Sequence, residues 1–162
     1  MSQTEIKNKE ISRSHAEDLI NEGQLDHIND HVADDYVWHR LGAAESIHGP
    51  DEVREFISGM RTAFPDLEVT VEDIFAEDDK VVRRDRLTGT HEGEFMGIQP
   101  TGKEIEIQSL VINQIDDGQM VESWGQSDVL GLMKQLGFFV VPGPRLALRM
   151  VIATVKSRLF GE

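Results

Sequence analysis

Acid–base and aromatic side chains share one face of the last predicted strand. Alternation along this strand gives the same parity to Glu122, Trp124, Gln126 and Asp128. A face that mixes polar and aromatic groups is typical of a cavity wall. A carboxylate in a dry pocket has a raised pKa and can both take and return a proton. Asp128 is alternatively the N-cap of a helix over 129–136, where Asp is a preferred residue, and the two roles can coexist.

A second candidate group is an arginine in the charged stretch 81–86. In a strand, Arg84 and Arg86 face one side, whereas Arg83 and Asp85 face the other. An inward Arg84 could pair with a buried carboxylate or orient a carbonyl or ester of a ligand. The alternative is cross-strand ion pairing on a solvated face, which accounts for Arg83 and Arg86 without difficulty.

Composition excludes several classes of function. The 162 residues carry a net charge of -14 and no cysteine. Nucleic-acid backbones require clustered Lys and Arg, so the charge argues against such a partner. The lack of cysteine excludes disulfides, thiolate catalysis and cysteine zinc sites. His27 and His31 stand four residues apart, but no third ligand is near them in sequence, so we expect no metal site.

Targeting signals are not expected. The N-terminal residues are polar, and no apolar run approaches the ~20 residues that a membrane-spanning helix needs. We therefore expect no signal peptide and no membrane span, and a cytoplasmic protein.

The elements that must position these side chains follow from hydrophobic spacing. Apolar residues at helical spacing predict helices over 11–22, 24–32 and 49–64, and a short one over 129–136. After Pro65 the period changes from 3.6 to 2. Strands are expected over 34–39, 67–71, 81–90, 103–115 and 119–127, with turns at Asp78 and Asp117. Helices followed by a run of antiparallel strands indicate one α+β domain over 1–137, with the helices on one face of a curved sheet.

Residues 138–162 form a distinct tail in this interpretation. An apolar connector leads to a helix with a basic stripe of Arg145, Arg149 and Lys156 opposite an apolar face. This helix could lie on an anionic membrane surface, cap the mouth of a cavity, or pack on the acidic body or a dimer mate. We expect the packing role.

Three segments resemble the SnoaL-like (polyketide cyclase-like) family. They are His48-Gly49-Pro50 through Leu67, the stretch from Gly89-Thr90-His91 to Pro100-Thr101-Gly102-Lys103, and the stretch from Asp117 through Trp124 to Gly137. The resemblance implies a nuclear-transport-factor-two-like, cone-shaped α+β fold around a deep apolar cavity. It also implies ring closure of a polyketide by intramolecular aldol condensation, with no cofactor or metal.

The resemblance also implies roles for particular residues. In the family an aspartate a few residues after the last-strand Trp acts as acid/base, and Asp128 matches that position. The family arginine matches Arg84, although Asp85 replaces the aromatic residue that usually follows it. His39 and His91 stand where related sheets line the cavity, and each could bind the ligand or be structural. The family commonly has a histidine beside that Trp, and the stretch from Trp124 to Asp128 has none.

Three functions remain open at this point. The first is a cofactor-free cyclase with Asp128 as acid/base and with Trp124, Gln126, Arg84, His39 and His91 lining the site. The second is an epoxide-type hydrolase, in which Asp–Arg–Asp groups activate water and Arg84 and Asp128 supply two of the three. The third is a non-catalytic binder of an apolar metabolite. In each case we expect an apolar small-molecule ligand and a homodimer or larger homo-oligomer.

Overall fold

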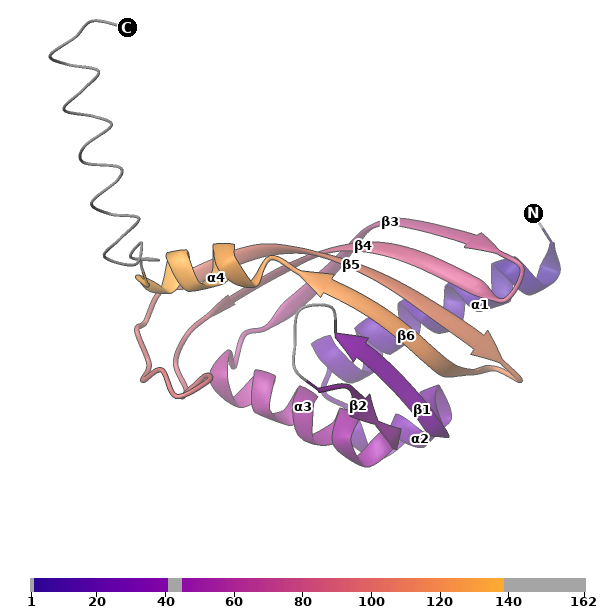
Figure 1. Ribbon diagram of the computed structural model, residues 1–162, viewed down its shortest axis with the longest axis horizontal. Coiled ribbons are helices and arrows are strands. Elements are labelled where there is room, and N and C mark those ends of the chain that lie inside the picture. Colours follow the sequence, from indigo (N-terminus) through magenta and orange to yellow (C-terminus); the bar gives the residue numbers. More distant parts are fainter. Residues whose placement is uncertain (1, 41–44, 139–162) are drawn as a thin grey trace, which may run out of the picture.

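Residues 2–40 and 45–138 are described by the computed structural model of the chain, in which a six-stranded sheet arches over the helices (Figure 1). The helical segments are α1 (Gln3–Ser14), the π-helix η1 (His15–Asn21), the 3-10 turn η2 (Leu25–His27), α2 (Ile28–His31), α3 (Gly49–Ala63) and α4 (Val129–Leu136). The strands are β1 (Val32–Arg40), β2 (Ile47–His48), β3 (Glu68–Glu77), β4 (Lys80–Thr90), β5 (Glu104–Asp116) and β6 (Gln119–Ser127). The predicted α+β class is confirmed.

The strand order places the first strand of the chain beside the last one. The sheet runs β2-β1-β6-β5-β4-β3, and every pair is antiparallel except β1 with β6. The parallel pair places Trp38 opposite Ser123 and His39 opposite Trp124. The first strand therefore forms one wall of any site built on the later strands.

The N-terminal helix begins earlier than its apolar spacing predicts. Ser2 and Glu5 form a capping box, in which Ser2 Oγ accepts from Glu5 N at 3.1 Å and Glu5 Oε2 accepts from Ser2 N at 2.6 Å. The face of α1 that packs on the sheet buries Asn8 and Ser12, which are polar. Hydrophobic periodicity could not detect a helix whose buried face is polar, so the predicted start at residue 11 is wrong.

Alternation in the strands separates two faces of the sheet. We call the face covered by the helices the inner face and the opposite one the outer face. On β4, Arg83 and Asp85 are buried on the inner face, whereas Arg84 lies half-exposed on the outer face. A register shift between Val71 and Asp73 interrupts the alternation of β3, which continues to Glu77 rather than ending at 71.

Two hydrophobic clusters hold the helices on the inner face. The first contains Leu19, Ile28, Val32, Tyr36, Ile47, Val53, Ile57, Val81, Ile115 and Met120. The second contains Ala63, Phe64, Leu67, Ile105, Ile107, Leu132 and Leu136. The second cluster anchors α4 at one end of the sheet, and the first anchors α2 and α3 at the other. The expectations for 139–162 lie outside the described residues.

Candidate functional site

A buried ion pair stands on the inner face of β4. Arg83 Nε lies 2.8 Å from Asp85 Oδ1 and donates to Oδ2 at 2.9 Å. The two side chains are only 4% and 5% exposed. Burial raises the pKa of Asp85, and the Arg83 guanidinium offsets part of that rise. The inner face therefore holds a carboxylate that is a stronger base than an ordinary exposed aspartate.

Hydrogen bonds extend from this ion pair across the sheet. Arg83 Nη1 donates to the carbonyl oxygen of Ser12 in α1. Asn113 Nδ2 donates to Ser12 Oγ at 2.8 Å, and Ser123 Oγ donates to Asn113 Oδ1 at 2.8 Å. Burial raises the pKa of Tyr36 on β1 to about 12. One helix and strands β4, β5 and β6 thus share one buried polar network.

Several buried polar atoms near this network have no hydrogen-bond partner within the described residues. They are Trp38 Nε1, Arg40 Nε, His15 Nδ1 and Asp85 Oδ1. A buried polar group without a partner costs about 1–3 kcal/mol. Such atoms are what the polar groups of a ligand, or ordered water, would satisfy.

Two of these atoms are donors on β1, namely Trp38 Nε1 and Arg40 Nε. The Trp38 ring packs edge-on against Phe56 of α3, with 5.1 Å between the ring centroids. The Arg40 guanidinium lies over the same Phe56 ring, 5.4 Å from its centroid. Gly125 leaves room for this wall, because an added Cβ would lie 2.9 Å from Trp38 Nε1.

Between the two clusters, several residues on the inner face of the sheet and on α3 are only half-buried. Half-buried residues there are Leu87 on β4, Ser109 and Val111 on β5, Gly125 and Ser127 on β6, and Phe56 and Met60 on α3. Most are small or apolar. This stretch, with the unpartnered atoms at its edges, is the part of the inner face best suited to a small apolar ligand.

Asp128 caps the last helix. Its Oδ1 accepts from Gly131 N at 2.8 Å, and the residue is exposed. The absence of a side chain at Gly131 is required, because a Cβ there would overlap the Asp128 carboxylate. The predicted N-cap is confirmed. Because β6 ends at Ser127, strand parity does not extend to Asp128, and its role in proton transfer stays a prediction.

Arg84 belongs to the outer face. It donates to Asp73 Oδ2 through Nε at 2.7 Å, and Nη1 pairs with Glu72. Its side chain is 43% exposed, and the neighbouring carboxylates raise its pKa. The alternation was read correctly, but the arginine that points inward is Arg83. The cross-strand ion pairing considered for Arg83 and Arg86 holds for Arg84 and Arg86 instead.

The side of β6 that was predicted to be a cavity wall belongs to the outer face of the sheet. His39 stacks on Trp124, with ring centroids 5.7 Å apart, and its Nε2 lies 2.7 Å from Glu122 Oε1. Gln126, on the same side of β6, is exposed. The interpretation of this face as a cavity wall was wrong, because Ser123 carries the buried parity of β6. An aromatic residue in an alternating strand does not by itself identify the covered face.

His91 is fully buried beside the loop that follows β4. Its Nδ1 accepts from Thr101 N at 3.2 Å, and its ring packs against Phe64 at 5.3 Å and Phe95 at 6.5 Å between centroids. His91 N donates to the carbonyl oxygen of Lys103, and Gly102 N donates to the carbonyl oxygen of His91, which closes the same loop. These contacts fit a structural histidine, but His91 Nε2 is buried without a hydrogen-bond partner within the described residues, so a ligand-binding role for His91 stays a prediction.

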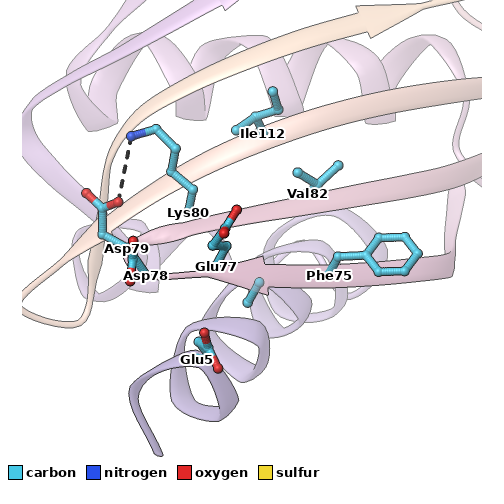
Figure 2. A pocket seen from close by; sticks show the side chains of 9 residues that line it. Glu5, Phe75, Glu77, Asp78, Asp79, Lys80, Val82 and Ile112 are labelled. Atoms are coloured by element: carbon cyan, nitrogen blue, oxygen red, sulfur yellow. Dashed lines mark ion pairs between the residues drawn. The ribbon is translucent and has the colours of Figure 1, made fainter. Parts of the chain in front are cut away.

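A shallow pocket of about 700 Å³ lies at the β3–β4 hairpin, away from the ion pair of the inner face (Figure 2). Phe75, Val82 and Ile112 form its apolar part. Its rim is acidic, and Lys80 Nζ lies 3.7 Å from Asp79 Oδ1 on one side of it. It has no buried polar group aimed into it, so we do not assign the chemistry to this pocket.

Two negative findings apply to the described part of the chain. No group of three or more His, Cys, Asp or Glu side chains there could hold a metal ion. No helix in that part is long and apolar enough to cross a membrane.

Comparison with known proteins identifies the family. The SnoaL-like polyketide cyclase family model matches residues 11–136, and the chain belongs to that family. No curated protein matches the chain. The segments that carried the resemblance cover α3, the His91 loop, and the stretch from the β5–β6 turn to the end of α4.

Solved structures agree with this assignment. A candidate SnoaL-like polyketide cyclase from Jannaschia sp. CCS1 is 25% identical, with a TM-score of 0.79 over 86% of this chain and 98% of that one. AclR of Streptomyces galilaeus, a candidate hydroxylase, is 30% identical, with a TM-score of 0.75 over 95% and 96%. IdmH of Streptomyces antibioticus, a candidate polyketide cyclase, is 32% identical, with a TM-score of 0.69 over 81% and 99%.

Proposed function

We propose that this chain is a cofactor-free enzyme that binds an apolar, enolisable small molecule on the inner face and closes a ring in it by intramolecular aldol condensation. The observation that carries the proposal is the accessible stretch of the inner face between the two clusters, bordered by unpartnered buried donors and a buried carboxylate. Membership of the SnoaL-like family supports the same reaction.

The chemistry needs a base, a donor and a shielded site. A base removes a proton from the carbon between two carbonyls, and the resulting enolate attacks a third carbonyl to form the new carbon–carbon bond. The alkoxide formed takes a proton from the acid. Asp128 is the proposed acid/base group, since it follows Ser127 at the rim of the inner face and only its Oδ1 is used in capping α4. Trp38 and Arg40 would donate to the oxygen on which charge develops.

The test compares two exposed carboxylates. Asp128→Asn keeps the cap acceptor and removes the base, whereas Asp116→Asn alters an exposed carboxylate at the far end of β5. We expect the wild-type chain and Asp116→Asn to cyclise members of a panel of aromatic β-keto esters that carry a further ketone or aldehyde group, followed by chromatography and NMR. Asp128→Asn should bind the same compounds but close the ring at least about 100-fold more slowly.

A non-catalytic binder is the second candidate, and the exposed, capping position of Asp128 favours it. Full activity of Asp128→Asn, or binding without turnover by every variant, would support this candidate instead. AclR is a candidate hydroxylase, which is a different reaction class from cyclisation, although its chain is similar to this one. The fold alone therefore does not decide the reaction. An epoxide-type hydrolase built on Arg84 and Asp128 has no support, because Arg84 lies on the outer face.

We also propose that a second copy covers the outer face. Phe75, Val82 and Ile112 are direct neighbours across β3, β4 and β5, and they are 64%, 38% and 38% exposed. Arg84 and Asp73 flank this apolar row on one side, and Lys80 and Glu77 flank it on the other, so both sides carry charges of both signs. A two-fold symmetric dimer would bury the row of each copy against that of the other. Light scattering should give a dimer for the wild-type chain and a monomer for Phe75→Lys. A monomeric wild-type chain would disprove this arrangement.

A further inference from the structure

Three polar side chains form a line across the inner face. Asp85 on β4 is the direct cross-strand partner of Ser109 on β5, and Ser109 is the partner of Ser127 on β6. Ser127 Oγ donates to Ser109 Oγ at 3.1 Å. We call Asp85, Ser109 and Ser127 the polar row. It crosses the accessible stretch of the inner face.

The members of the row differ in exposure. The Asp85 side chain is 5% exposed, whereas the two serines are half-buried. A ligand on the inner face therefore meets the serine hydroxyls first and has the carboxylate behind them. Cross-strand partners have Cβ atoms about 4.5–5.5 Å apart, which lets a serine hydroxyl reach a facing carboxylate by side-chain rotation.

Rotation of the Ser109 hydroxyl toward Asp85 would give Asp85 Oδ1 a hydrogen bond. This oxygen lies near Arg83 Nε but has no hydrogen bond of its own within the described residues. An ionised carboxylate can only accept hydrogen bonds. If Ser109 turns its hydrogen toward Oδ1, its oxygen, which already accepts from Ser127 Oγ, has one lone pair left to accept from a ligand.

We propose that the polar row is a binding subsite for an acidic hydroxyl group, such as a phenol or an enol, which donates to Ser109 and is oriented by Asp85 behind it. Arg83 is a positioning residue, since it fixes the Asp85 carboxylate. The inference rests on the proposed inner-face ligand site and adds a preference for one kind of ligand group. It requires no catalysis.

Burial raises the pKa of Asp85, and the Arg83 guanidinium favours the ionised form that the row needs as an acceptor. Arg83 on the same strand is the charged group paired with it. Val71 and Ser109, its partners on β3 and β5, carry no charge. His15 of η1 stays neutral at ordinary pH, because burial lowers its pKa to about 3. The preference for a hydroxyl donor should therefore weaken when acid protonates Asp85.

The test uses two matched probes, 2-naphthol and its methyl ether 2-methoxynaphthalene. The two share the ring system, but only the naphthol can donate a hydrogen bond. Binding is measured by calorimetry on the full chain. We expect the wild-type chain to bind the naphthol about tenfold or more tightly than the ether, as a hydrogen bond to a charge-assisted acceptor predicts.

Variants separate the subsite from the rest of the inner face. Ser109→Ala should remove the preference for naphthol while leaving the affinity for the ether unchanged, and Asp85→Asn should do the same. If Asp85→Asn fails to fold, Arg83→Gln/Asp85→Asn leaves no unpaired charge and replaces it. Thr88→Ala, on the outer face of β4, is the control and should retain the wild-type preference.

The outcomes distinguish this inference from the proposed function. Equal affinity of the wild-type chain for the two probes, or a preference that survives Ser109→Ala, would overturn the polar row and leave the inner-face ligand site standing. Failure of the wild-type chain to bind either probe would overturn both. A preference lost in Ser109→Ala and kept in Thr88→Ala supports the inference.

Discussion

Adjacent arginines of β4 make the same kind of ion pair in opposite environments. Arg83 pairs with Asp85 on the inner face, where the side chains are 4% and 5% exposed. Arg84 pairs with Asp73 on the outer face, where they are 43% and 46% exposed. Solvent screens the outer pair, and its removal should matter little. The inner pair is desolvated, so its partners depend on each other and can act on a ligand.

The largest expected effect comes from breaking each pair in turn. Asp85→Ala leaves the Arg83 charge buried and unpaired, which costs about 3–5 kcal/mol of unfolding free energy. Asp73→Ala leaves Arg84 in solvent beside Glu72 and should cost under about 1 kcal/mol. Urea denaturation of the two variants measures the difference. Equal losses would show that burial does not distinguish the two faces.

A second difference between the faces is the protonation of histidine. Burial first, and then Arg83 and His31, lower the pKa of His15 from 6.5 to about 3. Between these values the unfolded chain binds a proton that the folded chain does not. The contribution of His15 is therefore present above pH 6.5 and is lost as the pH falls toward 3, by up to a few kcal/mol.

His15→Gln tests that pH dependence. The variant has no titrating group at this position, so its unfolding free energy should fall less steeply than that of the wild-type chain between pH 6.5 and 3. His27→Gln, which alters an exposed histidine, is the control and should follow the wild-type curve. Parallel curves for His15→Gln and the wild-type chain would show that His15 takes up its proton in the folded state.

The sequence predicted the fold better than the site. The hairpin turns were predicted because Asp78, Asp117 and Gly118 adopt positive φ, for which Asp and Gly are suited. The predicted limits of β4, β5 and β6 lie within a residue or two of those observed. The short β2 and the early start of α1 were missed, since neither has an apolar pattern of its own.

The site was missed because both faces of β4 carry a valine and an arginine. Alternation separates Arg83 from Arg84 but does not say which one is covered. That depends on Ser12, 71 residues away, whose carbonyl accepts from Arg83. The signal present in the sequence was the opposite charge of Arg83 and Asp85 two positions apart, an arrangement that lets two same-face groups pair within one strand.

Two glycines extend the comparison from charge to packing. At Gly125, an added Cβ would lie 2.9 Å from Trp38 Nε1, so Gly125→Ala should displace the β1 wall and cost about 1–3 kcal/mol. At Gly59, on the exposed side of α3, a Cβ would have no neighbour within 4 Å, and Gly59→Ala should stabilise by up to about 1 kcal/mol. Thermal unfolding measures both changes. A stabilising Gly125→Ala would mean that the Trp38 side of the inner face is not tightly packed.

The smallest expected effect concerns a surface carboxylate whose pKa is shifted in the opposite direction to that of Asp85. Hydrogen bonds from Thr90 N at 2.5 Å and Thr90 Oγ1 at 2.7 Å lower the pKa of Asp66 from 3.8. The contribution of Asp66 is therefore present above pH 3.8 and is lost as the pH falls through its lowered pKa. Asp85 has a raised pKa, so its own contribution is present at low pH and is lost as the pH rises through that pKa.

Asp66→Asn should therefore reduce the unfolding free energy by under about 1 kcal/mol at pH 7 and by less as the pH falls below 3.8. Thr90→Val, which removes the hydroxyl donor and keeps the backbone donor, should show the same trend at smaller size. Urea midpoints measured across the acid range check both variants. A loss that grows toward low pH would mean that folding favours the neutral form of Asp66, as it does for Asp85. The contrast between an exposed and a buried carboxylate would then not hold in this chain.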